Sequence, residues 1–286
     1  MINMNLQDEI DEIIQRAFRE DISTGDVTTL ATVPNTVLGR AAFLVKDDGV
    51  VAGLDVCERV FHLLDPELEF TAHTTNGSSV SRGEIIAEVK GPAASILTAE
   101  RTALNFLQRM SGIATLSAKF ALVVKGTKAV IIDTRKTVPG LRVTDKLAVV
   151  QGGCKNHRQG LYDMFLIKDN HIAASGSVTR AVEACRNYMK LNGFTSKIEV
   201  EVKTLEETKE ALNAKADIIM LDNFELQLMK EAVALINHQA LVEASGGVNL
   251  NTVRQIAETG VDFISVGALT HSVKALDISL NLIMNT

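Results

Sequence analysis

The second half of the chain alternates short apolar runs with amphipathic stretches. Helical spacing of apolar residues predicts helices at 141–151, 177–192, 205–214, 225–236 and 250–258. Between and around them lie runs with the length of strands: AVIID (129–133), MFLI (164–167), IEVEV (198–202), DIIML (217–221), ALVEA (240–244) and DFISV (262–266). This alternation predicts a parallel sheet and favours an incomplete (β/α) barrel. A flat doubly wound sheet is the alternative, but no G-x-G-x-x-G dinucleotide fingerprint is present.

The first half has a less regular pattern, which predicts an α+β sandwich domain with antiparallel strands. The segment 41–53 is typical of a hairpin that turns at Asp48-Gly49, and 71–91 holds strand-sized pieces. Helices are predicted over 5–20, 53–64 and 94–124, the last with a break near Ser111-Gly112. We place the domain boundary so that 1–111 forms the sandwich and 112–271 the barrel.

Composition excludes several classes of protein. The chain has 286 residues, 46% of them hydrophobic, and a net charge of −6, which argues against nucleic-acid binding. No apolar run has the length of a membrane span, and the acidic amphipathic start does not resemble a signal peptide. The three cysteines cannot all pair, so we expect reduced thiols and a cytoplasmic protein. Cys154-x-x-His157 could indicate zinc, but no second pair follows it.

Polar residues and glycines follow almost every predicted strand. In a barrel these positions meet at one rim, where active sites lie. Their repeated delivery to that rim predicts a site rather than ordinary turns. The residues at the rim are Asp133, Thr134, Arg135, Lys136, Lys168, Glu201, Asp222, Ser245, Gly246, Gly247, Gly267 and Ala268.

Two of these groups indicate phosphate binding. Ser245-Gly246-Gly247 stands between a strand and a helix predicted to start near Asn249, where backbone N–H groups can approach an anion. Gly267-Ala268 follows the next strand, and barrels often bind phosphate between their last two loops. Ordinary turn glycines are the alternative reading.

The stretch from 133 to 171 is locally basic in an acidic chain. Arginine suits carboxylate or phosphate because its planar fork forms two parallel hydrogen bonds, and Arg135 and Arg158 lie close to strands. His157 and His171 could be core histidines, although His157 stands beside Arg158. Glu199 and Glu201 point to the same face of their strand; such carboxylates can pair with lysines, bind Mg²⁺ or hold ligand hydroxyls.

Several ordered motifs resemble the quinolinate phosphoribosyltransferase family over essentially the whole chain. They are EDISTGDVTT (20–29), AERTALNFLQRMSGIAT (99–115), DTRKTVPGLR (133–142), GGCKNHRQGLYDMFLIKDNH (152–171), IEVEV (198–202), MLDNF (220–224), ASGGV (244–248) and SVGALTHS (265–272). The resemblance implies phosphoribosyl transfer from 5-phosphoribosyl-1-pyrophosphate to quinolinate, with loss of CO₂, in NAD biosynthesis. It also implies Mg²⁺ and no organic cofactor. The fold implied is a sandwich joined by the C-terminal tail 272–286, plus an incomplete seven-stranded α/β barrel.

The resemblance further implies roles for individual residues. Arg135, His157, Arg158 and Lys168 would contact the quinolinate carboxylates, with Arg101 reaching in from the partner of a homodimer. The donor site would comprise Thr134, Lys136, Lys168, Glu201, Asp222, Ser245, Gly246, Gly247, Gly267 and Ala268, with Lys136, Lys168, Glu201 and Asp222 as catalytic groups and Glu201 and Asp222 beside the metal.

Two rival functions remain at this point. A related phosphoribosyltransferase could use another acceptor, such as nicotinate, although the density of cations at 135–168 favours a dicarboxylate. A binding or regulatory protein could keep the phosphate loops without turnover, although the presence of both Glu201 and Asp222 argues against it.

Overall fold

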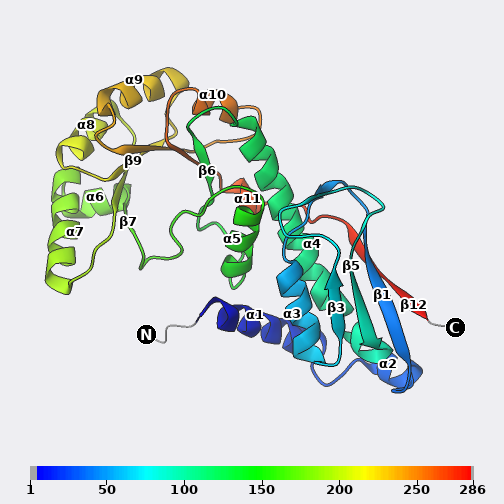
Figure 1. Ribbon diagram of the computed structural model, residues 1–286. Coiled ribbons are helices and arrows are strands. Elements are labelled where there is room, and N and C mark those ends of the chain that lie inside the picture. Colours follow the sequence, from blue (N-terminus) through cyan, green and yellow to red (C-terminus); the bar gives the residue numbers. More distant parts are fainter. Residues whose placement is uncertain (1–4, 285–286) are drawn as a thin grey trace. The chain divides into compact units, whose positions relative to one another are not determined.

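The computed structural model describes residues 5–284 and divides them into two compact units (Figure 1). The first unit contains the residues up to 118, 137–153 and the residues from 269 on. The second contains 119–136 and 154–268. The domain boundary placed at 111/112 stays a prediction. Among the described residues, no helix is long and apolar enough to cross a membrane.

A six-stranded parallel sheet forms the centre of the second unit. Its order is β6-β11-β10-β9-β8-β7, and every predicted strand is confirmed to within one residue at each end. A seventh strand was expected; among the described residues a single parallel bridge, Ile132 to Lys155, extends the sheet beyond β6. The strands are β6 (Val130–Ile132), β7 (Phe165–Ile167), β8 (Ile198–Val202), β9 (Ile218–Asp222), β10 (Leu241–Ser245) and β11 (Phe263–Ser265).

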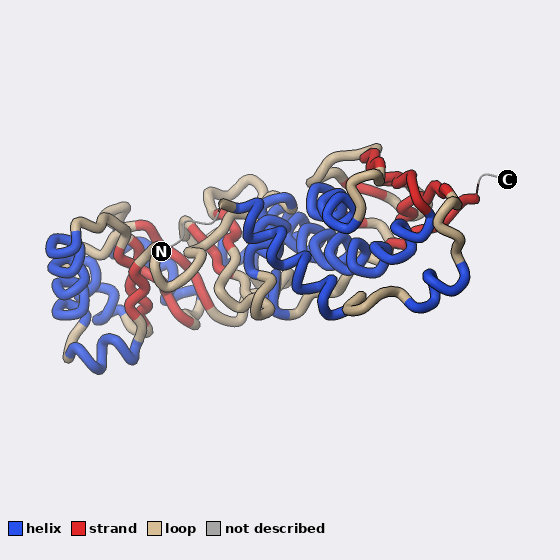
Figure 2. Tube along the Cα trace, turned by 90° about the horizontal axis from the view of Figure 1, so that it is seen from below, coloured by secondary structure: helices blue, strands red, loops and turns tan. Residues whose placement is uncertain are grey.

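Helices cover the outer face of this sheet, as Figures 1 and 2 both show. On β8, Ile198, Val200 and Val202 are fully buried, and they alternate with Glu199 and Glu201 on the opposite, inner face. Apolar side chains therefore hold β8 to the helices, and its two glutamates face the inside of the barrel. The helices are α6 (Asp169–Ser175), α7 (Val178–Asn192), α8 (Leu205–Asn213), α9 (Leu226–Ile236) and α10 (Val253–Ala257).

Helix α10 is shorter than predicted and starts later. The sequence predicted a helix over 250–258 that begins near Asn249, but α10 begins at Val253. Asn249 and Thr252 bond the local backbone instead: Asn249 Oδ1 accepts from Asn251 N at 2.9 Å, and Thr252 Oγ1 accepts from Asn249 N at 3.1 Å. These bonds resemble those of a helix cap, and Val253 N also donates to the Asn249 carbonyl at 2.9 Å. A capped turn therefore leads into α10, which begins at Val253 rather than at residue 250.

The first unit is built on an antiparallel sheet of order β12-β1-β5-β3. Strand β12, near the C-terminal end of the described residues, pairs with β1 in this sheet. Phe43 of β1, Phe61 of α3 and Phe70 of β3 form a cluster of rings about 6 Å apart that joins helix and sheet. The elements are α1 (Leu6–Asp21), α2 (Val27–Thr32), β1 (Leu38–Val45), β2 (Gly49–Val50), α3 (Leu54–Leu64), β3 (Glu69–Ala72), β4 (Ser79–Val80), β5 (Ile85–Pro92), α5 (Arg142–Gln151) and β12 (Ile278–Met284); α4 (Ala93–Val123) and α11 (Ala268–His271) cross the division between the units.

The predicted hairpin over 41–53 is wrong. Strand β1 pairs with β5 and β12, and β2 pairs with β4 in a separate two-stranded sheet. The long backbone hydrogen-bond ladders that β1 forms with β5 and β12 stabilise this arrangement more than a local turn at Asp48-Gly49 would stabilise a hairpin. The Asp48 carboxylate instead accepts a hydrogen bond from the Arg82 N–H at 2.9 Å.

The predicted break near Ser111-Gly112 is also wrong, because α4 runs through both residues. Ser111 Oγ accepts a hydrogen bond from Ala52 N at 3.0 Å, which ties the helix to the segment before α3. A Cβ on Gly112 would lie 2.2 Å from the Lys274 carbonyl oxygen. Gly112 therefore allows close packing of another segment rather than ending the helix.

A buried ion pair between α4 and α5 supplies a stability test. Arg109 Nε and Nη2 each donate to Asp145 at 2.8 Å, and the Asp145 side chain is fully buried. Arg109→Leu leaves that carboxylate buried without its cation, so we expect a loss of about 3–5 kcal/mol in the free energy of unfolding. Arg59→Leu is the control: its forked pair with Asp11 is partly exposed, and we expect a loss of about 1 kcal/mol or less. Denaturant melts measure both, and equal losses would contradict the assignment.

Candidate active site

A cavity of about 450 Å³ opens at the carboxyl ends of the strands of the second unit. It brings together nine of the predicted site residues, from five strands and the loops that follow them. Leu166, Met220, Glu243 and Ser265 line it as well and were not predicted. The predicted residues at the cavity are Thr134, Arg135, Lys136, His157, Arg158, Lys168, Glu201, Asp222 and Ser245.

Sheet register explains why these side chains meet. Glu201 of β8, Met220 of β9 and Glu243 of β10 are partners across neighbouring strands, and so are Asp222 and Ser245. Residues in register on adjacent strands face the same side of a sheet, so both rows point to the inner face.

The pocket has a cationic side formed by two arginines. Arg158 Nη1 donates to the Met164 carbonyl at 3.1 Å, and burial, then the charge of nearby Arg135, lower the pKa of Arg158. The Nε of Arg135 is buried and donates to no acceptor among the described residues. Neither guanidinium forms a salt bridge with a carboxylate in the part of the chain that the structure describes. Two adjacent cations with spare donors suit a ligand with more than one negative charge.

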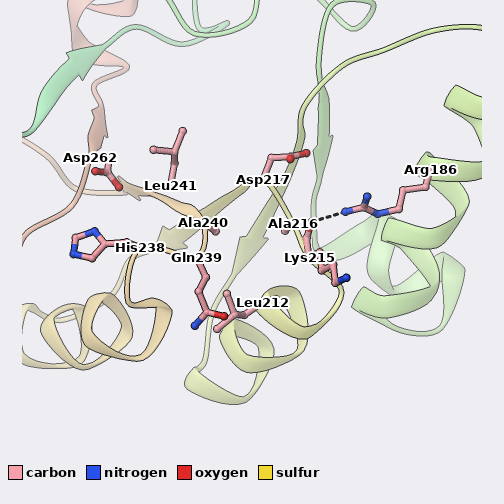
Figure 3. Close-up of a pocket in the computed structure, with 10 residues that line it drawn as sticks. All are labelled: Arg186, Leu212, Lys215, Ala216, Asp217, His238, Gln239, Ala240, Leu241 and Asp262. Carbon is pink, nitrogen blue, oxygen red and sulfur yellow. Dashed lines mark hydrogen bonds between the residues drawn. The ribbon is translucent and has the colours of Figure 1, made fainter.

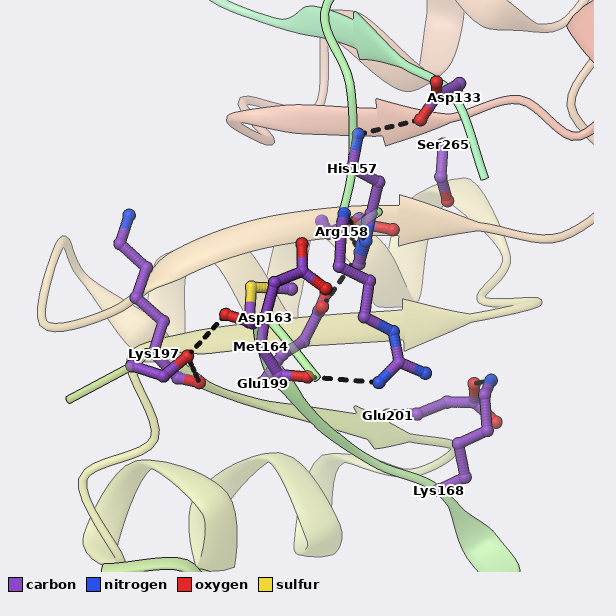
Figure 4. Close-up of polar contacts among 12 residues, drawn as sticks. Asp133, His157, Arg158, Asp163, Met164, Lys168, Lys197, Glu199, Glu201 and Ser265 are labelled. Atoms are coloured by element: carbon purple, nitrogen blue, oxygen red, sulfur yellow. Dashed lines mark hydrogen bonds and ion pairs between the residues drawn. The ribbon is translucent and has the colours of Figure 1, made fainter. Parts of the chain in front are cut away.

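Carboxylates and lysines stand together on another side of the pocket. Lys168 Nζ forms an ion pair with Glu201, as Figure 4 shows. Asp222 ends the neighbouring strand and also lines the cavity. Lys203 pairs with Asp169 at 2.8 Å, and this contact, more than the nearby charges of Asp222 and Glu201, raises the pKa of Lys203. The alternation of charges allows this side to hold a cation and an anion together.

His157 is held between two buried carboxylates. Its Nε2 lies 2.9 Å from Glu199 Oε2 and 3.5 Å from Glu243 Oε2, and Glu199 and Glu243 are 0% and 1% exposed. Its Nδ1 accepts a hydrogen bond from the backbone N–H of Arg158 at 2.6 Å. The backbone N–H of His157 donates to Asp133 Oδ1 at 2.8 Å (Figure 4). A zinc site at Cys154-x-x-His157 would require His157 to lie beside Cys154. Among the described residues, the group of possible metal ligands around His157 contains Glu199 and Glu243 instead.

The electrostatics of this group follow from burial and close charges. Burial by itself would lower the pKa of His157, but Glu199 and Glu243 outweigh it and raise the pKa to about 10. Burial and then Glu243 raise the pKa of Glu199 to about 7, against the opposite effect of His157. A second proton on the imidazole would have to enter at Nδ1, where it would displace the Arg158 hydrogen bond. Nε2, which faces the carboxylates, is therefore the protonated nitrogen, and the Arg158 hydrogen bond at Nδ1 opposes the second proton that the raised pKa favours.

The predicted phosphate loops lie near the cavity only in part. Ser245 lines it, whereas Gly246, Gly247, Gly267 and Ala268 are not among its lining residues. Gly246 has φ +96° and also a packing role, because a Cβ there would lie 2.1 Å from Asn223 Oδ1. Gly247 has φ +62° and open space around it.

Arg101 belongs to the first unit, whereas the cavity is formed by the second. Arg101 is exposed on α4. The sequence did not single out Glu243: a lone carboxylate in ALVEA gives no local signal of a partner on another strand.

A second cavity, of about 660 Å³, lies at the opposite, amino ends of β9, β10 and β11 (Figure 3). Asp217 and Asp262 line it, and both serve the sheet: Asp217 Oδ2 accepts from Ile198 N at 2.8 Å and Asp262 Oδ2 from Val242 N at 2.9 Å. In barrels this end contributes stability and the carboxyl end contributes chemistry. The 450 Å³ cavity is therefore the candidate site.

A parallel open barrel with cations and carboxylates at its carboxyl rim defines the class: an α/β-barrel enzyme that acts on anionic substrates. Family models agree in detail. Residues 26–111 match the quinolinate phosphoribosyl transferase N-terminal domain, and residues 113–281 match the C-terminal domain. The chain belongs to the quinolinate phosphoribosyltransferase family.

Individual relatives support this membership. The chain is 46% identical to "quinolinate phosphoribosyltransferase [decarboxylating] 2, mitochondrial" of Nicotiana glauca, covering 96% of this chain and 82% of the relative. It is 41% identical to "probable nicotinate-nucleotide pyrophosphorylase [carboxylating]" of Bacillus subtilis (strain 168), over 97% and 94%. The crystal structure of NadC from Streptococcus pyogenes superposes with a TM-score of 0.93 at 38% identity, over 100% of both chains.

Proposed function

We propose that the chain transfers the phosphoribosyl group of 5-phosphoribosyl-1-pyrophosphate to quinolinate and releases pyrophosphate and CO₂, giving nicotinate mononucleotide for NAD biosynthesis. The family and the names of the relatives support an enzyme of this pentosyltransferase class. The observation that carries the proposal is the pair Arg135 and Arg158 in one cavity, with a buried Arg135 donor that no described residue accepts. Quinolinate, with two carboxylates, supplies acceptors for both.

In the proposed reaction the residues act by position and charge. Arg135, Arg158 and Lys168 hold the quinolinate carboxylates so that the pyridine nitrogen faces C1 of the ribose. As the bond from C1 to pyrophosphate breaks, Glu201 and Asp222 stabilise the positive charge that develops on the ribose. Lys136 and Lys168 attract the departing pyrophosphate. The nitrogen then bonds to C1 and becomes cationic. The adjacent carboxylate departs as CO₂, and its electron pair stays on the ring carbon, where the neighbouring positive charge stabilises it until a proton from solvent adds there.

Mg²⁺ belongs to this proposal as the metal partner of the donor. Mg²⁺ is commonly held by one or two carboxylates plus substrate phosphates, and Glu201 and Asp222 lie on adjacent strands at the cavity. When bound, it would offset negative charge on the pyrophosphate. No organic cofactor is required by these steps.

A homodimer is the second part of the proposal. Arg101 is exposed and lies in the unit that does not form the cavity, which is compatible with a role at the partner subunit's site. In a twofold dimer each site would then be built from both chains. A cytoplasmic location is proposed as well; the Nicotiana glauca relative is named as mitochondrial.

The proposed phosphate position at Gly247 has a matched pair of variants. Both Asn and Asp tolerate the left-handed backbone that Gly247 adopts, and the space around it is open. Gly247→Asp places a negative charge near the donor's 5-phosphate, whereas Gly247→Asn keeps the shape without the charge. We expect the KM for the donor to rise at least about tenfold more in the Asp variant. Steady-state kinetics decide, and equal donor KM values in the two variants would refute the phosphate position.

The acceptor distinguishes the proposal from its alternative, a related phosphoribosyltransferase that uses nicotinate. Pyrophosphate release from the donor should require quinolinate and should stay near background with nicotinate. Activity with nicotinate and none with quinolinate would establish the alternative. Release with neither acceptor, despite donor binding, would favour a binding protein.

A further inference from the structure

In the wall of the cavity, a buried cluster of side chains joins three parts of the barrel. Glu199 comes from β8 and Glu243 from β10, with β9 between them, and both reach the same imidazole nitrogen of His157. Interior side chains of barrels meet in layers supplied by alternate strands, and this group has that arrangement. The layer here is charged, and His157 and Glu243 line the same cavity as the two arginines.

The segment that carries His157 lies at the β6 edge of the sheet. Among the described residues, one β-bridge, between Ile132 and Lys155, joins it to the sheet. The Asp133 carboxylate holds its backbone at His157 N, and the imidazole Nδ1 accepts from the next residue, Arg158. The imidazole thus links the glutamates of β8 and β10 to the backbone of an arginine in the pocket.

The distances are those of a close ion pair rather than of ligands around a metal. The three side chains are of metal-binding type. Ligand atoms around a tetrahedral metal at about 2.0–2.1 Å lie about 3.3 Å apart, and His157 Nε2 and Glu199 Oε2 are closer, at 2.9 Å. That separation fits an N–H donated to a carboxylate.

We propose that Glu199 and Glu243 are positioning residues for the acceptor site: they hold the His157 imidazole through Nε2, and His157 in turn fixes Arg158 against the pocket. The inference rests on the proposed function, since it assigns Arg158 to the quinolinate carboxylates. Glu199 and Glu243 then act on the acceptor site through the imidazole and Arg158, since both ring nitrogens contact the protein. The donor side, formed by Lys136, Glu201 and Asp222, does not depend on this link.

The test compares both substrates in Glu199→Gln. The amide keeps the shape but loses the negative charge, so the imidazole is held less firmly. We expect the KM for quinolinate to rise at least tenfold, with the donor KM and kcat changed less than threefold. Asp217→Asn is the matched control, because the Asp217 carboxylate lies at the other end of the barrel and accepts a hydrogen bond from a backbone N–H. In this variant the KM values for quinolinate and for the donor should either stay unchanged or shift together. An unchanged quinolinate KM, or equal rises for both substrates, in Glu199→Gln would overturn the inference.

A double-mutant cycle separates positioning from general loosening. If Glu199 acts through Arg158, adding Glu199→Gln to Arg158→Lys should cost much less than the product of the two separate fold-changes. Independent, multiplicative losses would contradict the link. Should Glu199→Gln fail to fold, ¹⁵N NMR of the wild-type histidine decides: a protonated Nε2 with a bare Nδ1 is expected, and a protonated Nδ1, in either the opposite tautomer or the imidazolium, overturns the inference. Failure of the proposed function would look different, because the wild-type enzyme itself would not release pyrophosphate with quinolinate.

Discussion

Equal mixing of two inactive variants, Arg101→Ala and Lys168→Ala, is expected to restore about a quarter of wild-type activity. Each homodimer should be nearly inactive, since one lacks a quinolinate contact and the other lacks the lysine that pairs with Glu201. After joint unfolding and refolding, about half of the dimers are mixed. If Arg101 acts across the interface, a mixed dimer has one site with both defects and one site with none.

The controls are the two variants unfolded and refolded alone, which should stay inactive, and refolded wild type, which sets the recoverable maximum. If Arg101 serves its own subunit, every site in the mixture keeps one defect and no activity returns. Full activity of Arg101→Ala by itself would make Arg101 an ordinary surface residue and remove it from the site.

Arg135→Lys is expected to be nearly as damaging as Arg135→Ala. Lysine keeps the charge but cannot form the two parallel hydrogen bonds of a guanidinium. The buried Arg135 Nε has no acceptor among the described residues, so it is free to donate to the ligand. A charge-assisted bond is worth about 1.5–3 kcal/mol, so kcat/KM for quinolinate should fall about 10- to 150-fold. Arg180→Lys, on the exposed side of α7, is the control and should retain wild-type kinetics. Wild-type kinetics in Arg135→Lys would remove this residue from the acceptor site.

The sequence predicted the parallel sheet well because each strand carries its own signal. Alternation in IEVEV fixes which residues face the helices, and the polar residue after each strand marks the rim. The contrast with 41–53 is instructive: there the local turn signal was genuine, yet pairing with β5 and β12 decided the structure. Such pairings join segments far apart in sequence and leave no local trace.

The same distinction applies to the site. Charged residues such as Arg135 and Lys168 stand out because they follow apolar strands. Glu243 does not stand out in the sequence, because its role depends on a contact with His157, which comes from a different part of the barrel. The helix after Ser245-Gly246-Gly247 begins at Val253, later than predicted, because a turn with side-chain bonds from Asn249 and Thr252 precedes it. Gly246 has a packing role that its position in the sequence could not reveal.

The most direct test of the central claim is a product balance with quinolinate labelled with ¹³C in the carboxyl group next to the ring nitrogen. With donor and Mg²⁺ present, the account predicts that nicotinate mononucleotide, pyrophosphate and ¹³CO₂ form in equal amounts, and that none forms when the donor is omitted. Pyrophosphate without nicotinate mononucleotide, or nucleotide formation from nicotinate alone, would contradict it.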